Sequence, residues 1–192
     1  MYRRFVIAVL KFFLFFMFPI RVIGKENVPA EGGVILAVNH SSNLDPVMIG
    51  VSVPYPQRIT FMAKAELFKN KLFAKLIRSL GAFPIQRGRG DIGAMKAAFE
   101  ILKNGDIMLI FPEGGRVKKG QKRRAKPGVA AIAARAKAPV VPVHIKNGYR
   151  WMRRVTVVYG EPVYFDEYEG RKLTGEETQK LADEVLERIY EL

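Results

Sequence analysis

Short runs of apolar, β-branched residues alternate with segments of helical pattern along most of this chain. No other feature limits the fold as strongly. The clearest run, "GGVILAV" at residues 32–38, predicts a buried strand. Further strands are predicted at 58–63, 82–86, 106–111, 139–145 and 153–160, and helices at 45–51, 66–80, 91–103, 127–137 and 174–192. This order predicts an α/β domain with a largely parallel or mixed central sheet flanked by helices. Pro84 places its strand near a sheet edge.

The N-terminal segment is apolar from residue 5 to residue 20 except for Lys11, and arginines flank it. A helix of sixteen residues is about 24 Å long, shorter than the hydrocarbon core of roughly 30 Å. We therefore predict a shallow membrane-anchoring helix over 1–21, followed by a folded domain over 22–192. A signal peptide and a helix packed on the protein's own core are the alternatives, although no A-x-A-like cleavage site follows.

The charge of the chain predicts anionic partners. Thirty-two Lys and Arg against eighteen Asp and Glu give a net charge of +14, which attracts nucleic acid, anionic lipid or phosphorylated small molecules. The basic stretch 118–126 is compatible with nucleic-acid binding, but no aromatic stacking motif accompanies it, and lipid docking needs fewer assumptions. The absence of cysteine excludes disulfides, a thiolate nucleophile and cysteine-ligated metals.

Residues 39–46, "NHSSNLDP", begin where the strand at 32–38 ends, a position at which α/β folds commonly carry ligands. His40 is one of two histidines, and imidazole, with an unperturbed pKa of about 6.5, suits a general base. Asp45 can hold one ring nitrogen and stabilise the imidazolium. The two meet if His40 lies in a loop and Asp45 begins a helix, because residues five apart on one helix point about 140° apart.

Other interpretations of these residues stay open at this point. Asp45 before Pro46 is a suitable helix start, and His40 can be a hydrogen-bonded loop residue. A serine nucleophile is not favoured, since Ser41 and Ser42 adjoin the histidine and no G-x-S-x-G motif occurs. No metal-ligand spacing is present either. If the pair is catalytic, His40 is expected to activate a substrate hydroxyl for direct attack.

Two segments with glycine and arginine follow predicted strands and indicate anion binding. In "FPEGGR" (111–116), glycines let backbone amides approach an oxyanion or phosphate, and Arg116 can hold phosphate through two hydrogen bonds. A tight turn with a solvated basic loop is the alternative. In "FPIQRGRG" (83–90), Arg87 takes a similar place. Residues 88–93 spell G-x-G-x-x-G, but the short proline-containing strand before them is atypical of a dinucleotide site, so no NAD or flavin is expected.

Four blocks, "NHSSNLD", "GAFPIQR", "FPEGGR" and "VPV", occur in this order across residues 22–164. Together they resemble the 1-acylglycerol-3-phosphate acyltransferase family, the lysophosphatidate acyltransferases of phospholipid synthesis. The first block fits the family's N-H-x-x-x-x-D motif. Lys126, Pro127 and Gly128 before an alanine-rich helix also fit its pattern.

The resemblance implies a mechanism without cofactor or metal. His40, oriented by Asp45, would deprotonate the sn-2 hydroxyl of lysophosphatidate, and the alkoxide would attack the thioester of acyl-coenzyme A or acyl carrier protein without a covalent acyl-enzyme. Arginines would hold the acceptor phosphate, and a proline would line the acyl-donor side. The implied substrate-binding residues are Asn39, Arg87, Glu113, Gly114, Gly115, Arg116 and Pro142.

The resemblance also implies a location on the cytoplasmic face of the cell membrane, with anionic lipids as partners and no nucleic acid. Gly115 departs from the family, which usually has threonine there. Another lysophospholipid or polar lipid therefore stays open as the acceptor. A non-catalytic module that binds anionic membranes is the alternative of another class, although such a module needs neither His40 nor Asp45.

Overall fold

Within the residues that the computed structural model describes (2–53, 58–85, 92–118, 120–121, 123–165 and 173–192), seven strands form one mixed sheet in the order β1-β7-β6-β2-β5-β3-β4. The strands are β1 (Ile20–Ile23), β2 (Val34–Val38), β3 (Ile59–Lys64), β4 (Ala82–Ile85), β5 (Ile107–Ile110), β6 (Val140–Lys146) and β7 (Val155–Tyr159). Neighbouring strands are parallel except β6 and β7. The predicted α/β domain with a mixed sheet is confirmed, as is the edge position of the strand that contains Pro84.

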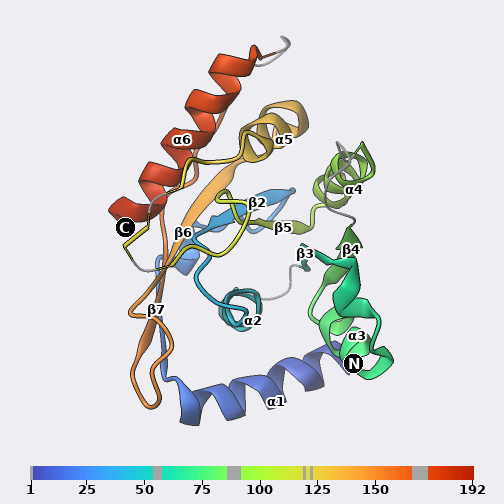
Figure 1. The fold of residues 1–192 in the computed structure, drawn as a ribbon, viewed down its shortest axis with the longest axis vertical. Coiled ribbons are helices and arrows are strands. Elements are labelled where there is room, and N and C mark those ends of the chain that lie inside the picture. Colours follow the sequence, from blue (N-terminus) through green and yellow to red (C-terminus); the bar gives the residue numbers. More distant parts are fainter. Residues whose placement is uncertain (1, 54–57, 86–91, 119, 122, 166–172) are drawn as a thin grey trace.

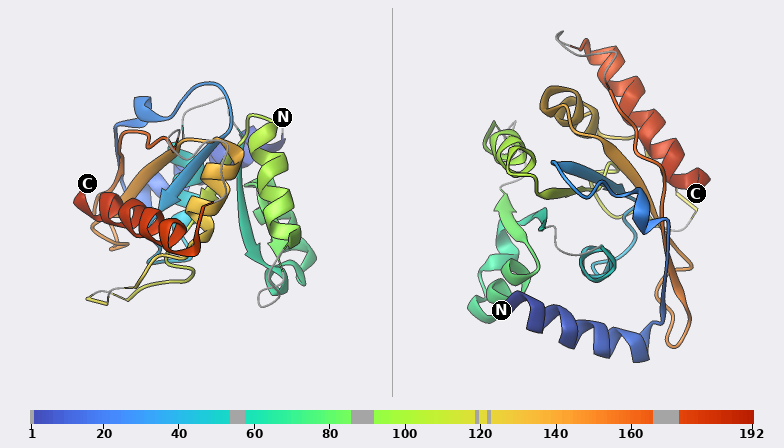
Figure 2. Two further views of the ribbon diagram at one scale, coloured as in Figure 1. Left: turned by 90° about the horizontal axis from the view of Figure 1, so that it is seen from above. Right: turned by 180° about the vertical axis from the view of Figure 1, so that it is seen from behind.

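Helices cover both faces of the sheet (Figures 1 and 2). On one face lie α1 (Tyr2–Met17), α2 (Asp45–Ser52) and α3 (Lys71–Ser79); on the other lie α4 (Ile92–Lys103), α5 (Gly128–Ala136) and α6 (Gly175–Glu191). All five residues of β2 are buried because both faces of this central strand are covered. The chain leaves β2 at its carboxyl end toward α2, and the loop after β5 ends in the same region (Figure 1).

The helical pattern predicted over 66–80 corresponds to two separate helical segments in the structure. A short 3₁₀ turn, Ala65–Phe68, precedes α3, which begins after Asn70. The side chain of Asn70 accepts a hydrogen bond from the backbone N–H of Phe73 at 3.0 Å. This N-cap satisfies a donor at the start of α3 and separates the two helical segments.

The apolar N-terminal segment is a helix that ends earlier than predicted. Helix α1 ends at Met17, and Pro19, which disfavours helix continuation, precedes strand β1. The sequence pattern does not identify a strand there, yet β1 pairs in parallel with β7. Among the described residues, no helix combines the length and apolarity needed to cross a membrane.

Helix α1 has two different faces. Ile7 and Leu14 are buried in the core that α1 shares with α2 and the sheet. The opposite side exposes large apolar side chains, namely Phe5, Val9, Phe12, Phe13, Phe16 and Met17. Packing on the protein's own core therefore accounts for only one face of this helix.

Candidate active site

His40 and Asp45 meet at the carboxyl end of β2. His40 follows the strand in a loop, Asp45 is the first residue of α2, and the distance from His40 Nδ1 to Asp45 Oδ2 is 2.8 Å. The carboxylate can only accept, so in the neutral imidazole the proton lies on Nδ1 and the lone pair of Nε2 is left to act as a base. This is the arrangement of loop histidine and helix-start carboxylate that the motif predicts.

Asp45 holds the loop as well as the imidazole. Its side chain is fully buried, and Oδ2 also accepts the backbone N–H groups of Ser41 and Ser42, both at 2.7 Å. These bonds turn the loop back on the helix start and fix the carboxylate beside the ring. The Asp45–Pro46 helix start and the His40–Asp45 pair, called the dyad below, are therefore compatible features of the same turn.

Tyr149 completes the environment of Asp45. Its hydroxyl donates to Asp45 Oδ1 at 2.6 Å, and its ring lies edge-on to Phe18 with centroids 5.7 Å apart. Burial, and then the adjacent charge of Asp45, raise the pKa of Tyr149, which keeps the hydroxyl protonated and able to donate. This residue is not predicted from the sequence, because no local pattern marks a tyrosine between β6 and β7 as a partner of Asp45.

Glu113 holds the main chain of His40. Glu113 is only 2% exposed, and its Oε2 accepts the backbone N–H of His40 at 2.6 Å. The hydroxyl of Tyr190, near the end of α6, donates to Oε1. Burial raises the pKa of Glu113, while the hydrogen bonds from Tyr190 and His40 act in the opposite direction. The structure thus places Glu113 behind the histidine, as a support of its backbone.

The ring and carbonyl of His40 also contact the segment that follows β5. The imidazole stacks on Phe111, with ring centroids 4.0 Å apart and an interplanar angle of 21°. The backbone N–H of Val117 donates to the carbonyl of His40 at 2.8 Å. This bond places Arg116, which is exposed, one residue from a direct contact with His40.

The two glycines before Arg116 permit close approach of cationic side chains. Gly114 has a φ of 68°, and a Cβ there would lie 2.9 Å from Lys126 Cγ. A Cβ on Gly115 would lie 3.0 Å from Arg123 Nη1. The space that a side chain at position 115 would need is therefore occupied in part by a guanidinium group.

Of the other predicted residues, one directly follows a strand of the sheet, one lies on a strand, and one is not described. The amide of Asn39 is buried and pairs with Ile145 on β6, accepting at 2.7 Å and donating at 3.2 Å. Pro142 is buried on β6, packed against Gly160. Arg87 lies outside the described residues. Direct substrate contact by these three residues stays a prediction.

Comparison with known protein families shows to which family the chain belongs. The family model described as Acyltransferase matches residues 19–146, more than half of the chain, and the match includes His40, Asp45 and the loop around Arg116. The chain belongs to the Acyltransferase family.

Individual relatives of this acyltransferase carry more specific names. It is 33% identical over 150 residues to the 1-acyl-sn-glycerol-3-phosphate acyltransferase of Bacillus subtilis (strain 168), covering 76% of this chain and 74% of that protein. It is 34% identical to the Streptococcus pneumoniae protein of the same name, covering 79% of this chain but only 57% of that protein. The crystal structure of the 1-acyl-sn-glycerophosphate acyltransferase PlsC from Thermotoga maritima superposes with a TM-score of 0.72 at 29% identity, over 98% of this chain and 80% of that one.

Both tyrosines of the site lie beyond the matched residues of the Acyltransferase model, which end at 146. Tyr149 and Tyr190 reach Asp45 and Glu113 across 104 and 77 positions of sequence. In this acyltransferase, hydrogen bonds that hold Asp45 and Glu113 therefore come from the β6–β7 connection and from α6. Among the described residues, no group of His, Asp and Glu side chains has the arrangement of a metal site.

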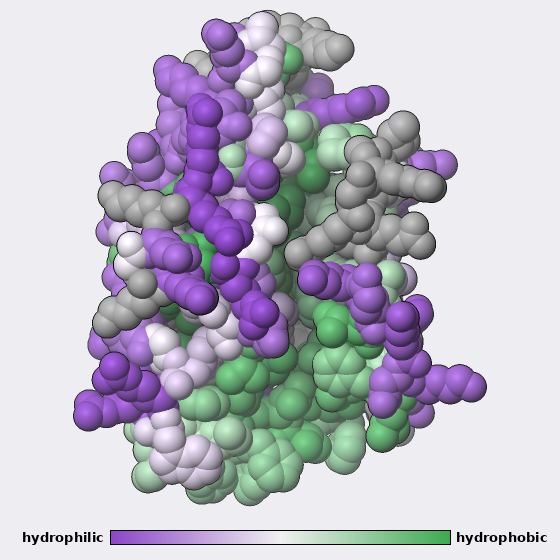
Figure 3. Space-filling model, viewed as in Figure 1, coloured by the Kyte–Doolittle hydropathy of each residue, from purple (hydrophilic) through white to green (hydrophobic). Residues whose placement is uncertain are grey.

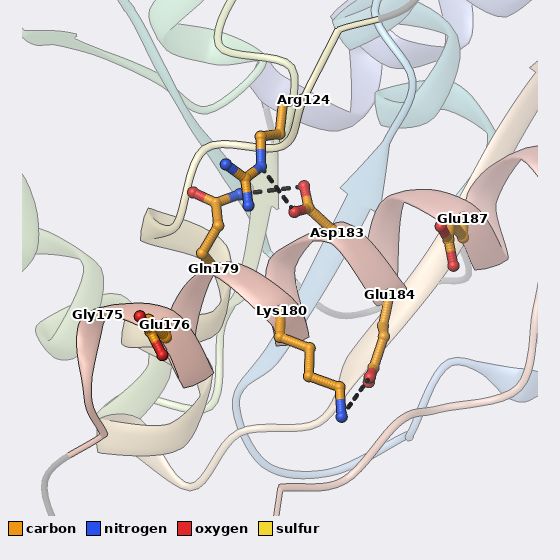
Figure 4. A pocket seen from close by; sticks show the side chains of 8 residues that line it. All are labelled: Arg124, Gly175, Glu176, Gln179, Lys180, Asp183, Glu184 and Glu187. Atoms are coloured by element: carbon orange, nitrogen blue, oxygen red, sulfur yellow. Dashed lines mark hydrogen bonds and ion pairs between the residues drawn. The ribbon is translucent and has the colours of Figure 1, made fainter.

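Helix α6 also fixes the basic loop that follows Arg116. Arg124 Nε lies 3.0 Å from Asp183 Oδ2, and the backbone N–H of Ala125 donates to Oδ1 at 3.1 Å. Figure 4 shows Arg124 and Gln179 converging on Asp183. These donors outweigh the opposing effect of burial and lower the pKa of Asp183. An open hollow of about 570 Å³ lies along this part of α6, but none of the predicted site residues lines it.

Proposed function

We propose that this acyltransferase moves a fatty acyl group from an acyl thioester to the sn-2 hydroxyl of lysophosphatidate, giving phosphatidate. The observation that carries the proposal is the His40–Asp45 pair, 2.8 Å apart beside the loop that bears Arg116. The activity named for the Bacillus, Streptococcus and Thermotoga relatives supports the choice of acceptor. Acyl-coenzyme A and acyl carrier protein are both anionic and both suit a chain with a net charge of +14.

In the proposed mechanism, His40 Nε2 takes the proton of the sn-2 hydroxyl as its oxygen attacks the thioester carbonyl carbon. Asp45 stabilises the imidazolium that forms and keeps the proton of the neutral ring on Nδ1. The carbon–sulfur bond then breaks, and the imidazolium returns the proton to the departing thiolate. No acyl-enzyme forms. A backbone amide of the 111–116 loop is proposed to stabilise the oxyanion.

The acceptor phosphate is proposed to bind beside the glycine-containing loop. Arg116 is exposed next to the contact between Val117 and His40, and its guanidinium can form two hydrogen bonds to phosphate oxygens. Gly114 and Gly115 leave the backbone open to approach. Arg87 is proposed as a second phosphate ligand, and Pro142 as part of the acyl-donor side. Asn39 and Glu113 are proposed to act through the strand end and loop that they hold.

A second acceptor is favoured by one observation. Gly115 replaces the threonine that is usual in the family, and a Cβ at this position would lie 3.0 Å from Arg123 Nη1. This difference changes the chemistry beside the proposed phosphate site. Another lysophospholipid or polar lipid is therefore the alternative acceptor.

We further propose that residues 1–21 attach the catalytic domain, residues 22–192, to the cytoplasmic face of the cell membrane. The exposed face of α1 supports this proposal, with Phe12 62% exposed and Phe13 and Phe16 similarly so. A helix of sixteen residues can lie in the plane of the membrane interface, so this attachment does not require a helix that crosses the bilayer. Anionic lipids are the proposed partners, because the chain is strongly basic.

An acceptor panel tests the proposal. The purified wild type is assayed in mixed micelles with a long-chain acyl-coenzyme A, or with acyl carrier protein, and with lysophosphatidate, glycerol 3-phosphate, another lysophospholipid or a monoacylglycerol. We expect phosphatidate from lysophosphatidate at the highest kcat/KM. Preference for a different acceptor would replace the assignment, and no product with any acceptor would contradict acyl transfer as proposed.

A further inference from the structure

The connection between β6 and β7 presents two large apolar side chains to solvent. Trp151 is 67% exposed and Met152 is 70% exposed. Met152 has a φ of 54°, a left-handed conformation that is unfavourable for a side chain of this size. Its backbone N–H donates to the carbonyl of Met17, the last residue of α1, at 2.9 Å. The turn is thus fastened to the end of α1 and holds both side chains outward.

A second apolar surface lies at the other end of α1. Helix α3 contacts α1, and it lies near the N-terminal end of that helix (Figure 1). The exposed apolar side chains of α3 and the turn before it are Leu67, Leu72, Phe73 and Leu76, with Leu72 81% exposed. Figure 3 shows hydrophobic side chains gathered along much of the side of the molecule on which α1 lies. The apolar surface therefore extends past both ends of the N-terminal helix.

The charge on these segments is almost all of one sign. Residues 2–17, 65–79 and 147–154 together contain ten Lys and Arg and a single acid, Glu66. A surface that combines exposed apolar side chains with lysine and arginine suits the interface of an anionic bilayer. Each such charge contributes about 1 kcal/mol near an anionic membrane, and tryptophan favours the headgroup level.

We propose that α1, α3 and the turn at 147–154 form one docking surface for an anionic lipid bilayer, in which Trp151 enters the headgroup region. This inference rests on the proposed membrane attachment and extends it from one helix to three segments. Tyr149, two residues before Trp151, donates to Asp45. Docking of this turn would therefore place the dyad next to the lipid surface. The acceptor would enter the site from this surface, and the acylated product would return to it.

Trp151 is the only tryptophan of the chain, so the unmodified protein carries its own probe. Its emission is measured with vesicles of equal parts phosphatidylcholine and phosphatidylglycerol, alongside flotation to measure binding. We expect the emission to shift to shorter wavelength, to be quenched by spin-labelled lipid and to be protected from acrylamide. A protein that floats with the vesicles while Trp151 stays open to acrylamide would overturn the role of the turn and leave attachment through α1 intact.

The part played by α3 is tested with the variant Leu72→Glu/Leu76→Glu. Two added negative charges and two lost apolar contacts are expected to lower the vesicle partition coefficient by about tenfold or more. Tyr164→Glu is the matched control, because Tyr164 is exposed beside α5, on the opposite face of the sheet. Equal binding by wild type and the α3 variant would exclude α3. A wild type that does not float would refute this surface and the proposed attachment together.

Discussion

Replacing Tyr149 by phenylalanine removes a single hydroxyl and keeps the ring against Phe18. That hydroxyl is the donor to Asp45 Oδ1, on a side chain with no exposed surface. A hydrogen bond to a charged group contributes about 1.5–3 kcal/mol. Without this donor the carboxylate is freer to rotate, and Oδ2 is held less well against His40 Nδ1. If the whole contribution is lost in the transition state, kcat falls by about ten- to a hundredfold.

Initial rates in mixed micelles, with lysophosphatidate and acyl-coenzyme A varied in turn, measure this effect. We expect kcat to fall while both KM values stay close to those of the wild type, because Tyr149 is proposed to touch neither substrate. The matched control is Tyr159→Phe, which removes a buried hydroxyl that pairs with Ser52 at 2.7 Å. It should lower the melting temperature without a comparable fall in kcat. A Tyr149→Phe variant that is less stable but turns over at the wild-type rate would refute the positioning role.

Three further predictions concern charge and packing around the site. Arg116→Ala should raise the KM for lysophosphatidate much more than that for the acyl donor, and steady-state kinetics showing an effect on the donor alone would contradict the phosphate assignment. Gly115→Thr should raise the acceptor KM less in an Arg123→Ala background than in the wild type, because its Cβ would lie 3.0 Å from Arg123 Nη1; additive effects in this double-mutant cycle would refute the steric link. Burial, and then the charge of Lys146, lower the pKa of His144. The folded state therefore binds fewer protons than the unfolded chain, and stability is lost as the pH falls below about 6.5. Denaturant unfolding of His144→Gln should show a smaller loss over that range, and identical pH profiles would exclude the effect.

Features that depend on neighbouring residues could be predicted from the sequence. The His40–Asp45 contact joins residues five positions apart, and a loop followed by a proline-marked helix start is enough to bring them together. The strands at 32–38 and 106–111 are short apolar runs whose burial follows from their composition. The N-cap of α6 is likewise local: Thr174 and Glu177 form a capping box.

The rest depends on tertiary contacts that no local pattern encodes. Strand β1 has four residues with alternating burial, too short to stand out after an apolar helix, and it forms by pairing with β7. Tyr149 and Tyr190 reach the site from segments far away in sequence. The periodicity of α6 marks its buried face but does not show that Tyr190 meets Glu113. The hydrogen bonds of these two tyrosines to Asp45 and Glu113 could be recognised only once the fold was known.

The measurement that tests the central claim most directly compares wild type with His40→Ala and Asp45→Asn in the mixed-micelle assay. Far-UV circular dichroism and vesicle flotation serve as controls for folding and membrane binding. We expect phosphatidate from the wild type, none above background from His40→Ala, and a rate lower by orders of magnitude from Asp45→Asn, with folding and flotation retained. Phosphatidate formation at the wild-type rate by a folded His40→Ala variant would contradict general-base catalysis by this dyad.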